Sequence, residues 1–178
     1  MLNVLFVATN ISVISPLVFK EVTILSKAFV KSSLDFAYIA LKEKLIKAKH
    51  QGSLPNVVVV VHLCGQPCDM KAIHALSIEY GFKVIEDASH AIGGRFQGQA
   101  IGSCEYSDIT VFSFHPVKIV TTAEGGAALT NDQALADKIR LYRSHGITRD
   151  ESLMENTSHG PWYYEQIDLG FNYRMTEL

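Results

Sequence analysis

A single lysine, Lys118, follows an apolar run in the middle of the chain. The run spans residues 111–114, and Gly125 and Gly126 close the segment behind the lysine. A lysine in apolar surroundings is poorly hydrated, so its neutral amine becomes accessible. A neutral amine can form a Schiff base with a carbonyl compound. A surface lysine at the end of a strand is the commoner case for one lysine taken alone, so other residues must decide between the two.

Three more side chains could serve the same ligand. Asp87 ends an apolar segment, where a carboxylate needs a cationic or hydrogen-bonding partner. A protonated pyridine nitrogen would be such a partner, and the ion pair would keep the ring an electron sink, as in pyridoxal phosphate. His90 follows three residues later, and the hydroxyl of Ser113 could donate to a phosphate. Each residue also has an ordinary role, as a turn cap, a loop histidine and a backbone-bonded strand serine, respectively.

Other kinds of site have less support. Segment 62–68 carries one histidine and two cysteines, but a zinc site normally needs four ligands in paired short spacings. A turn at the end of a strand explains this segment better. The glycine patterns of dinucleotide sites and of P-loops are absent, and residues 93–98 resemble the former only loosely.

Length and composition are typical of a globular α/β protein. The 178 residues are 48% hydrophobic and 19% charged, which allows one buried core. The net charge of −2 argues against a nucleic-acid partner. The sequence has no apolar run of membrane length, and its first residues lack the basic segment of a signal peptide. Three cysteines at irregular positions favour a reducing compartment, so we expect a cytoplasmic protein.

The hydrophobic pattern alternates strands and helices from residue 57 onward. Residues 57–63 form a run rich in β-branched residues, typical of a parallel strand buried on both faces. Asp69 and Gly81 are the expected caps of a helix between them. The pattern predicts strands at 3–8, 57–63, 83–87, 109–114 and 127–130, helices at 41–50, 70–80 and 133–144, and irregular strand and loop over 10–36.

This alternation indicates an α/β fold with a mainly parallel sheet flanked by helices. In such sheets, ligands bind beyond the carboxyl ends of the strands. Asp87 lies at one of those ends. The expected fold therefore places the carboxylate where a ligand would bind.

The order of these motifs resembles the pyridoxal-phosphate sugar aminotransferases of the DegT/StrS type. The likeness covers about residues 57–178 and is weaker before them, and it is strongest toward the aminotransferases of the pseudaminic acid pathway. The motifs that carry it are FVATN at 6–10, EDASHA at 86–91, GS at 102–103, FSFHPVK at 112–118, EGG at 124–126, RSHG at 143–146 and GFNYRM at 170–175.

The resemblance implies pyridoxal phosphate as the cofactor, the large domain of a fold-type I aminotransferase as the fold, and a homodimer. It also implies six site residues: Lys118 as the catalytic residue that forms the Schiff base and moves protons, Asp87 on the pyridine nitrogen, His90 beside the ring oxygen O3, Ser113 on the phosphate, Phe6 stacked on the ring, and Asn172 reaching the phosphate of the neighbouring subunit.

The resemblance further implies transamination of a UDP-linked 4-keto-6-deoxy-N-acetyl sugar with glutamate, in the synthesis of surface or flagellar glycans. Some relatives are dehydratases with a histidine at the lysine position, and Lys118 argues against that chemistry. Two parts of the family pattern have no match: the phosphate-binding segment before the FVAT block and the C-terminal small domain. We therefore expect residues 1–178 to form a partial large domain of low solubility. The alternative is a catalytically incompetent fragment or a non-catalytic relative that binds the cofactor.

Overall fold

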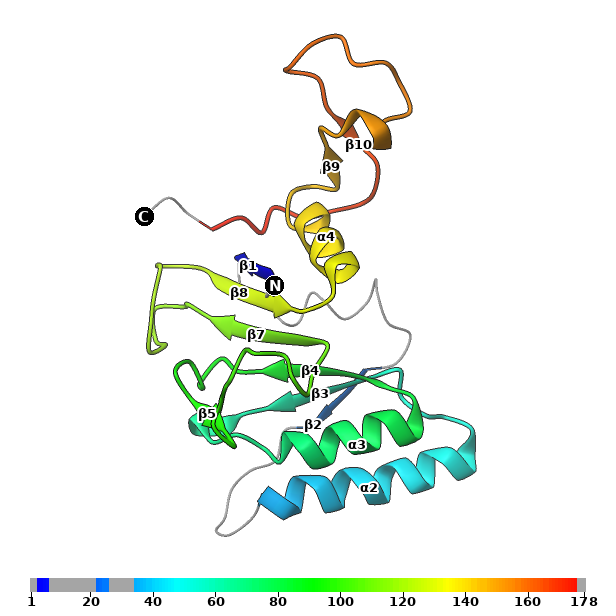
Figure 1. The fold of residues 1–178 in the computed structure, drawn as a ribbon, viewed down its shortest axis with the longest axis vertical. Coiled ribbons are helices and arrows are strands. Elements are labelled where there is room, and N and C mark those ends of the chain that lie inside the picture. The colour runs from blue at the N-terminus through cyan, green and yellow to red at the C-terminus, as the bar shows by residue number, and fades with distance from the viewer. Residues whose placement is uncertain (1–2, 7–21, 26–33, 176–178) are drawn as a thin grey trace.

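A six-stranded sheet forms the centre of the molecule (Figure 1). The computed structural model describes residues 3–6, 22–25 and 34–175, with side chains from Tyr38 onward. The strands lie in the order β1-β8-β7-β4-β3-β2. Their bounds are β1 Asn3–Phe6, β2 Val22–Leu25, β3 Val57–Val61, β4 Lys83–Asp87, β7 Ile109–Ser113 and β8 Gly126–Thr130.

The sheet is mainly parallel, as the sequence predicts. Strands β2, β3, β4 and β7 run parallel to one another, and β8 lies antiparallel between β7 and β1. In β3, Val58 and Val60 pack in the larger hydrophobic cluster, and Val57 and Val59 pack in a second one. Because successive strand residues point to opposite faces, both faces of β3 are buried. The α/β fold class is confirmed.

Among the described residues, three helices accompany the sheet: α2 Leu34–Gln51, α3 Met70–Tyr80 and α4 Gln133–Tyr142. Figure 1 shows α2 and α3 side by side below the sheet, whereas α4 lies near β1 and β8. Helix α3 matches its predicted bounds because both ends are capped. The Asp69 carboxylate accepts the Ala72 N–H at 3.1 Å, and Gly81 takes the left-handed conformation at φ 77°.

Several predicted bounds were wrong. The 10–36 segment, expected to be strand and loop, contains β2 but also the first residues of α2; residues 10–21 and 26–33 lie outside the described residues. The strand predicted at 57–63 ends at Val61, because its partner β4 ends opposite it at Asp87. The segments between the predicted elements contain two short hairpins, β5 Arg95–Phe96 with β6 Gln99–Ala100, and β9 Ile147–Thr148 with β10 Glu165–Gln166.

Candidate active site

The carboxyl ends of neighbouring parallel strands bring the predicted residues to one edge of the sheet. Asp87 is the last residue of β4, and Ser113 is the last residue of β7. The two strands are adjacent, and the Ala88 N–H donates to the Val111 carbonyl at 2.9 Å just beyond their pairing. This is the edge at which parallel α/β sheets bind ligands.

Lys118 lies in the loop after β7 and contacts His90, which follows β4. Its Nζ is 3.0 Å from His90 Nε2. The loop is held at its base, because the Thr122 N–H donates to the Phe114 carbonyl at 3.1 Å and the Phe114 N–H donates to the Gly125 carbonyl at 2.8 Å. The structure therefore joins two of the predicted residues directly.

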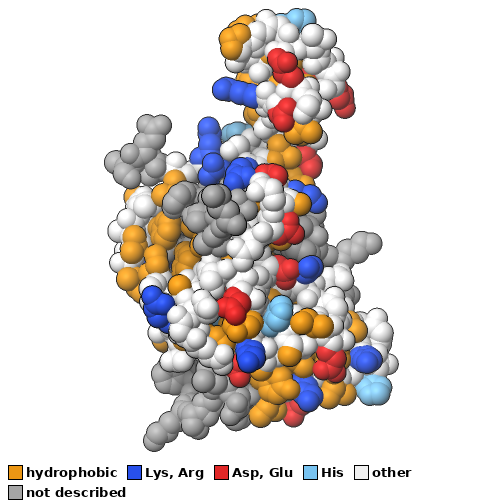
Figure 2. Space-filling view, viewed as in Figure 1, with side chains coloured by type: hydrophobic (Ala, Val, Ile, Leu, Met, Phe, Trp, Pro, Cys, Tyr) orange, Lys and Arg blue, Asp and Glu red, His pale blue; other side chains and the backbone are white. Residues whose placement is uncertain are grey.

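The surroundings of Lys118 differ from the expectation of an apolar, poorly hydrated lysine. Lys118 is half-buried, but its neighbours Val117 and Ile119 are 79% and 69% exposed. Figure 2 shows hydrophobic side chains on the flank of the molecule formed by the loop between β7 and β8. The apolar residues around this lysine therefore face solvent in the single chain, because nothing in its described part packs over them.

Asp87 closes a turn and keeps one oxygen available. Its Oδ1 accepts two hydrogen bonds from Ser89: one from the backbone N–H at 3.1 Å and one from the hydroxyl Oγ at 2.6 Å. Its Oδ2 has no hydrogen-bond partner among the described residues. The side chain is half-buried. Asp87 thus has both roles that the sequence left open, since it caps a turn and still offers an oxygen to a cation.

Ser113 is half-buried at the same edge. Its Oγ accepts the His115 N–H at 3.4 Å, which leaves its own O–H able to donate. Within the described residues it makes no hydrogen bond to Asp87, His90 or Lys118. A role on a ligand phosphate therefore stays a prediction.

Neither of the other two predicted residues has a described contact with Lys118. Phe6 ends β1 opposite Ala127, and its side chain lies outside the described part of the chain. Asn172 forms a bridge with Ser144 beyond the end of α4, and its Oδ1 accepts from Arg174 Nε at 3.0 Å. Stacking by Phe6 and a contact of Asn172 with a second subunit both stay predictions.

The structure also shows a buried polar network that the sequence analysis missed. His62 is fully buried and its Nε2 donates to Glu86 Oε2 at 2.8 Å. Oε1 of the same carboxylate accepts from the hydroxyls of Ser107 and, at 3.0 Å, of Thr110. Glu86 lies opposite Thr110 in the parallel pairing of β4 and β7. Pairing these two predicted strands in parallel would have been the way to find this contact from the sequence.

The network sets the charge on Glu86. Burial by itself would raise the pKa of this carboxyl, but the donors His62, Ser107 and Thr110 outweigh it and hold the pKa below its usual value. The same site affects a neighbouring thiol: burial first, and the Glu86 charge second, raise the pKa of Cys68 to about 11. The carboxylate is therefore held in its ionised form inside the protein.

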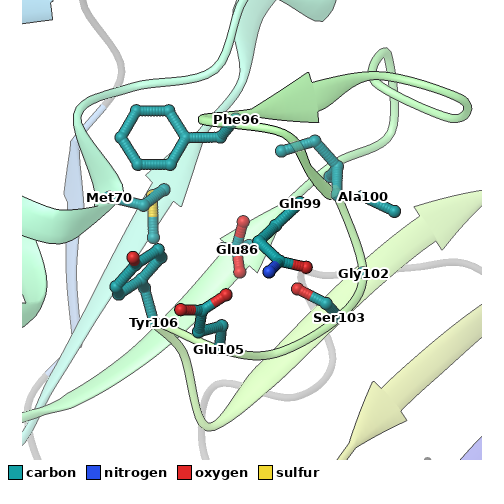
Figure 3. A pocket seen from close by; sticks show the side chains of 10 residues that line it. Met70, Glu86, Phe96, Gln99, Ala100, Gly102, Ser103, Glu105 and Tyr106 are labelled. Atoms are coloured by element: carbon teal, nitrogen blue, oxygen red, sulfur yellow. The ribbon is translucent and has the colours of Figure 1, made fainter.

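A small pocket lies on the Glu86 side of β4 and not on the Lys118 side. Figure 3 shows Glu86 among residues of the 95–106 segment, with Met70 from α3. None of the four residues Asp87, His90, Ser113 and Lys118 lines it. The pocket is therefore separate from the candidate site.

Segment 62–68 forms a turn and not a metal site. The strand-end turn expected at 62–68 is present as a 3-10 turn, Leu63–Gly65, and no group of three or more possible metal ligands occurs in the part of the chain that the structure describes. No helix among these residues is long and apolar enough to cross a membrane.

Comparison with protein families gives a match over most of the chain. The model of the DegT/DnrJ/EryC1/StrS aminotransferase family matches residues 32–178. This range includes β3, β4 and β7, and with them the edge that carries Asp87, Ser113 and Lys118.

Named relatives and a solved structure agree with this match. The UDP-4-amino-4,6-dideoxy-N-acetyl-beta-L-altrosamine transaminase of Campylobacter jejuni is 36% identical over 140 residues, 78% of this chain and 34% of that protein. The spore coat polysaccharide biosynthesis protein SpsC of Bacillus subtilis is 42% identical over 123 residues, 69% of this chain and 31% of that protein. The chain thus spans about a third of these relatives. The Helicobacter pylori aminotransferase PseC, involved in the biosynthesis of pseudoaminic acid, superposes with a TM-score of 0.72 at 25% identity, over 97% of this chain and 49% of that one.

Proposed function

The chain belongs to the DegT/DnrJ/EryC1/StrS aminotransferase family, and we propose that it forms the lysine-bearing central part of a pyridoxal-phosphate-dependent sugar aminotransferase. The observation that carries this proposal is the contact of Lys118 Nζ with His90 Nε2 at 3.0 Å, on the sheet edge where Asp87 ends β4. A surface lysine without function would need neither this partner nor this place.

The residues present fit pyridoxal phosphate. The cofactor has an aldehyde, a ring nitrogen that can be protonated and a phosphate, and the edge offers an amine, a carboxylate oxygen and a hydroxyl. Lys118 would hold the aldehyde, Asp87 the ring nitrogen and Ser113 the phosphate. When bound, the cofactor supplies an electron sink for the carbon that loses a proton.

The chain's own groups then have separate tasks. Asp87 Oδ2, which has no hydrogen-bond partner among the described residues, would keep the ring nitrogen protonated by its negative charge. Ser89 fixes that carboxylate through Oδ1. Lys118 Nζ is the base that carries a proton to and from the reacting carbon, and His90 orients it.

For the substrates we propose a UDP-linked 4-keto-6-deoxy-N-acetyl sugar as acceptor and glutamate as amino donor, in a glycan-building pathway in the cytoplasm. The names of the Campylobacter and Helicobacter relatives support the sugar, and the three free cysteines support the reducing compartment. We also propose that a second subunit completes the site, with Phe6 and Asn172 in their predicted roles.

A second candidate is a chain that binds the cofactor without turnover. The exposure of Val117 and Ile119 beside Lys118 favours it, because a hydrated amine is a weaker nucleophile and base. An assay with glutamate and the UDP-keto sugar separates the two: amino sugar appears in the first case and not in the second.

Absorbance spectroscopy with pyridoxal phosphate tests the lysine. We expect Schiff-base absorbance in the parent chain, its loss in Lys118→Ala, and its retention in Lys71→Ala, which removes an exposed lysine on α3. Equal absorbance in both variants would show that the aldehyde reacts with lysines in general, and the assignment of Lys118 would be lost.

A further inference from the structure

Glu86 and Asp87 are consecutive residues at the end of β4, and their side chains have different surroundings. Glu86 is 4% exposed, and its carboxylate accepts hydrogen bonds from His62, Ser107 and Thr110. Asp87 is half-buried and contacts none of these three side chains through its carboxylate. Because successive side chains of a strand point to opposite faces of the sheet, Glu86 faces the core and Asp87 faces the candidate site.

The donors to Glu86 come from both sides of β4. Thr110 lies on β7, opposite Glu86 in the parallel pairing, and its hydroxyl donates to Oε1 at 3.0 Å. His62 follows β3, and its Nε2 donates to Oε2 at 2.8 Å, since a carboxylate can only accept. In the sheet order β7-β4-β3, one buried carboxylate therefore connects three neighbouring strands at their carboxyl ends.

The same two neighbouring strands hold the main chain of Asp87. The His62 N–H donates to the Asp87 carbonyl at 3.0 Å. On the other side, the Ala88 N–H donates to the Val111 carbonyl at 2.9 Å. His62 thus donates twice at this end of the sheet, from its ring to Glu86 and from its backbone to Asp87. A shift of the His62 ring would therefore displace the main chain that carries the Asp87 carboxylate.

We propose that Glu86 is a positioning residue: by joining His62 and Thr110, its carboxylate sets the place of the Asp87 main chain and with it the direction of the Asp87 carboxylate. Hydrogen bonds to an ionised group are short and strong, which suits a carboxylate to this task. The need for an exact direction rests on the proposed function, in which Asp87 Oδ2 pairs with the ring nitrogen of the cofactor, because small displacements of a binding group weaken its action.

A second carboxylate joins the same strands at their other end and provides the control. Asp108 lies directly before β7, and its Oδ2 accepts the Val84 N–H at 2.8 Å. Its Oδ1 accepts from Lys83 Nζ, also at 2.8 Å. Lys83 begins β4 and Asp87 ends it. Loss of the Asp108 charge should therefore disturb the opposite end of β4 from the one that Glu86 holds.

Amide hydrogen exchange measured by NMR tests the proposal without any cofactor. In Glu86→Gln, the ratio of the His62 exchange rate to the Val84 exchange rate should rise about tenfold, the effect of losing one hydrogen bond to a charged group near Asp87. In Asp108→Asn this ratio should not rise, because the weakened acceptor is that of Val84. Equal acceleration of both amides in Glu86→Gln would show that Glu86 only stabilises the fold, and it would overturn the proposal.

A milder pair of variants keeps the test decisive if Glu86→Gln does not fold. Thr110→Val replaces one hydroxyl with a methyl group and should raise the His62 to Val84 ratio about three- to tenfold. Thr110→Ser keeps the hydroxyl and should give the parental ratio. A parental ratio in Thr110→Val, or the same rise in both variants, would contradict a role of the Glu86 hydrogen bonds in holding this end of β4.

The affinity for pyridoxamine 5′-phosphate gives a second readout, because this compound has no aldehyde to react with Lys118. Measured by calorimetry, its Kd should rise about five- to tenfold in Glu86→Gln and stay within about twofold of the parent in Asp108→Asn. An unchanged Kd in Glu86→Gln would contradict an effect on the site. If the parent chain does not bind the compound, the proposed function fails, whereas the exchange ratio still decides whether Glu86 positions Asp87.

Discussion

At the scale of single residues, Glu86 shows how a charge is kept inside the protein. The carboxylate is 4% exposed and accepts hydrogen bonds from His62, Ser107 and Thr110. These donors hold its pKa below the usual value of 4.5. The Glu86 carboxyl therefore binds its proton more weakly in the folded chain than in the unfolded chain. Ionised Glu86 thus stabilises the fold at neutral pH.

We expect this stabilisation to disappear in acid. The contribution is complete above about pH 4.5, the usual carboxyl pKa, and it is lost as the pH falls through the lower folded pKa. Glu86→Gln should cost about 1–3 kcal/mol at pH 7, because its amide group would face the His62 donor. Urea unfolding of both proteins at pH 7 and near pH 4 measures this. The difference between their free energies of unfolding should be smaller in acid than at pH 7. A difference that is the same at both pH values would mean that the pKa of Glu86 is not lowered in the folded chain.

The cysteines give a second prediction at this scale. Cys64 is exposed, whereas burial and then the Glu86 charge raise the pKa of Cys68 to about 11. At pH 8 only about one Cys68 thiol in a thousand is ionised, and the thiolate is the reactive form. Iodoacetamide should therefore modify Cys64 first, as read by peptide mass spectrometry, and Cys68 only after unfolding in urea. Equal rates in the folded chain would contradict the burial of Cys68.

At the scale of elements, the caps of α3 are the local signal that the sequence gives most directly. Asp69→Ala removes the acceptor of the Ala72 N–H and should lower the free energy of unfolding by about 1 kcal/mol. Asp69→Asn keeps a side-chain oxygen at the cap and should change the free energy by only a few tenths of a kcal/mol. Thermal or urea unfolding of the two variants checks this, and equal losses would show that charge and not capping matters there.

Elements were predictable from the sequence where their signals are local. Helix α3 has both caps and a clean apolar stripe. Helix α2 was predicted eight residues too short, at 41–50 instead of 34–51, because Ile39 and Ile46 are exposed at 49% and 43% and blur the stripe. Lys118 and Asp87 could be predicted as site residues because ligands of parallel sheets bind beyond the carboxyl ends of the strands. The His62–Glu86 pair could not, since it depends on which strands neighbour one another and on the path of the chain after β3.

At the scale of the whole molecule, the flank beside Lys118 is the feature that a single chain leaves unexplained. Val117, Ile119 and Val120 are 79%, 69% and 46% exposed on the loop after β7. Exposed apolar groups of this kind are common at protein interfaces. We propose that a second subunit covers them in the assembled enzyme, which would also remove water from around Lys118 and strengthen its amine as a nucleophile.

Self-association of the chain tests this proposal. Fully burying a valine or isoleucine contributes about 1.5–3 kcal/mol, so the double variant Val117→Ser with Ile119→Ser should weaken association at least about tenfold. Ile78→Ser removes a side chain that is 73% exposed on α3, away from this loop, and should leave association as in the parent. Sedimentation velocity over a range of concentrations measures all three proteins. A parent chain that stays monomeric, or an Ile78→Ser variant that dissociates as far as the double variant, would show that the flank beside Lys118 is not where a second copy binds.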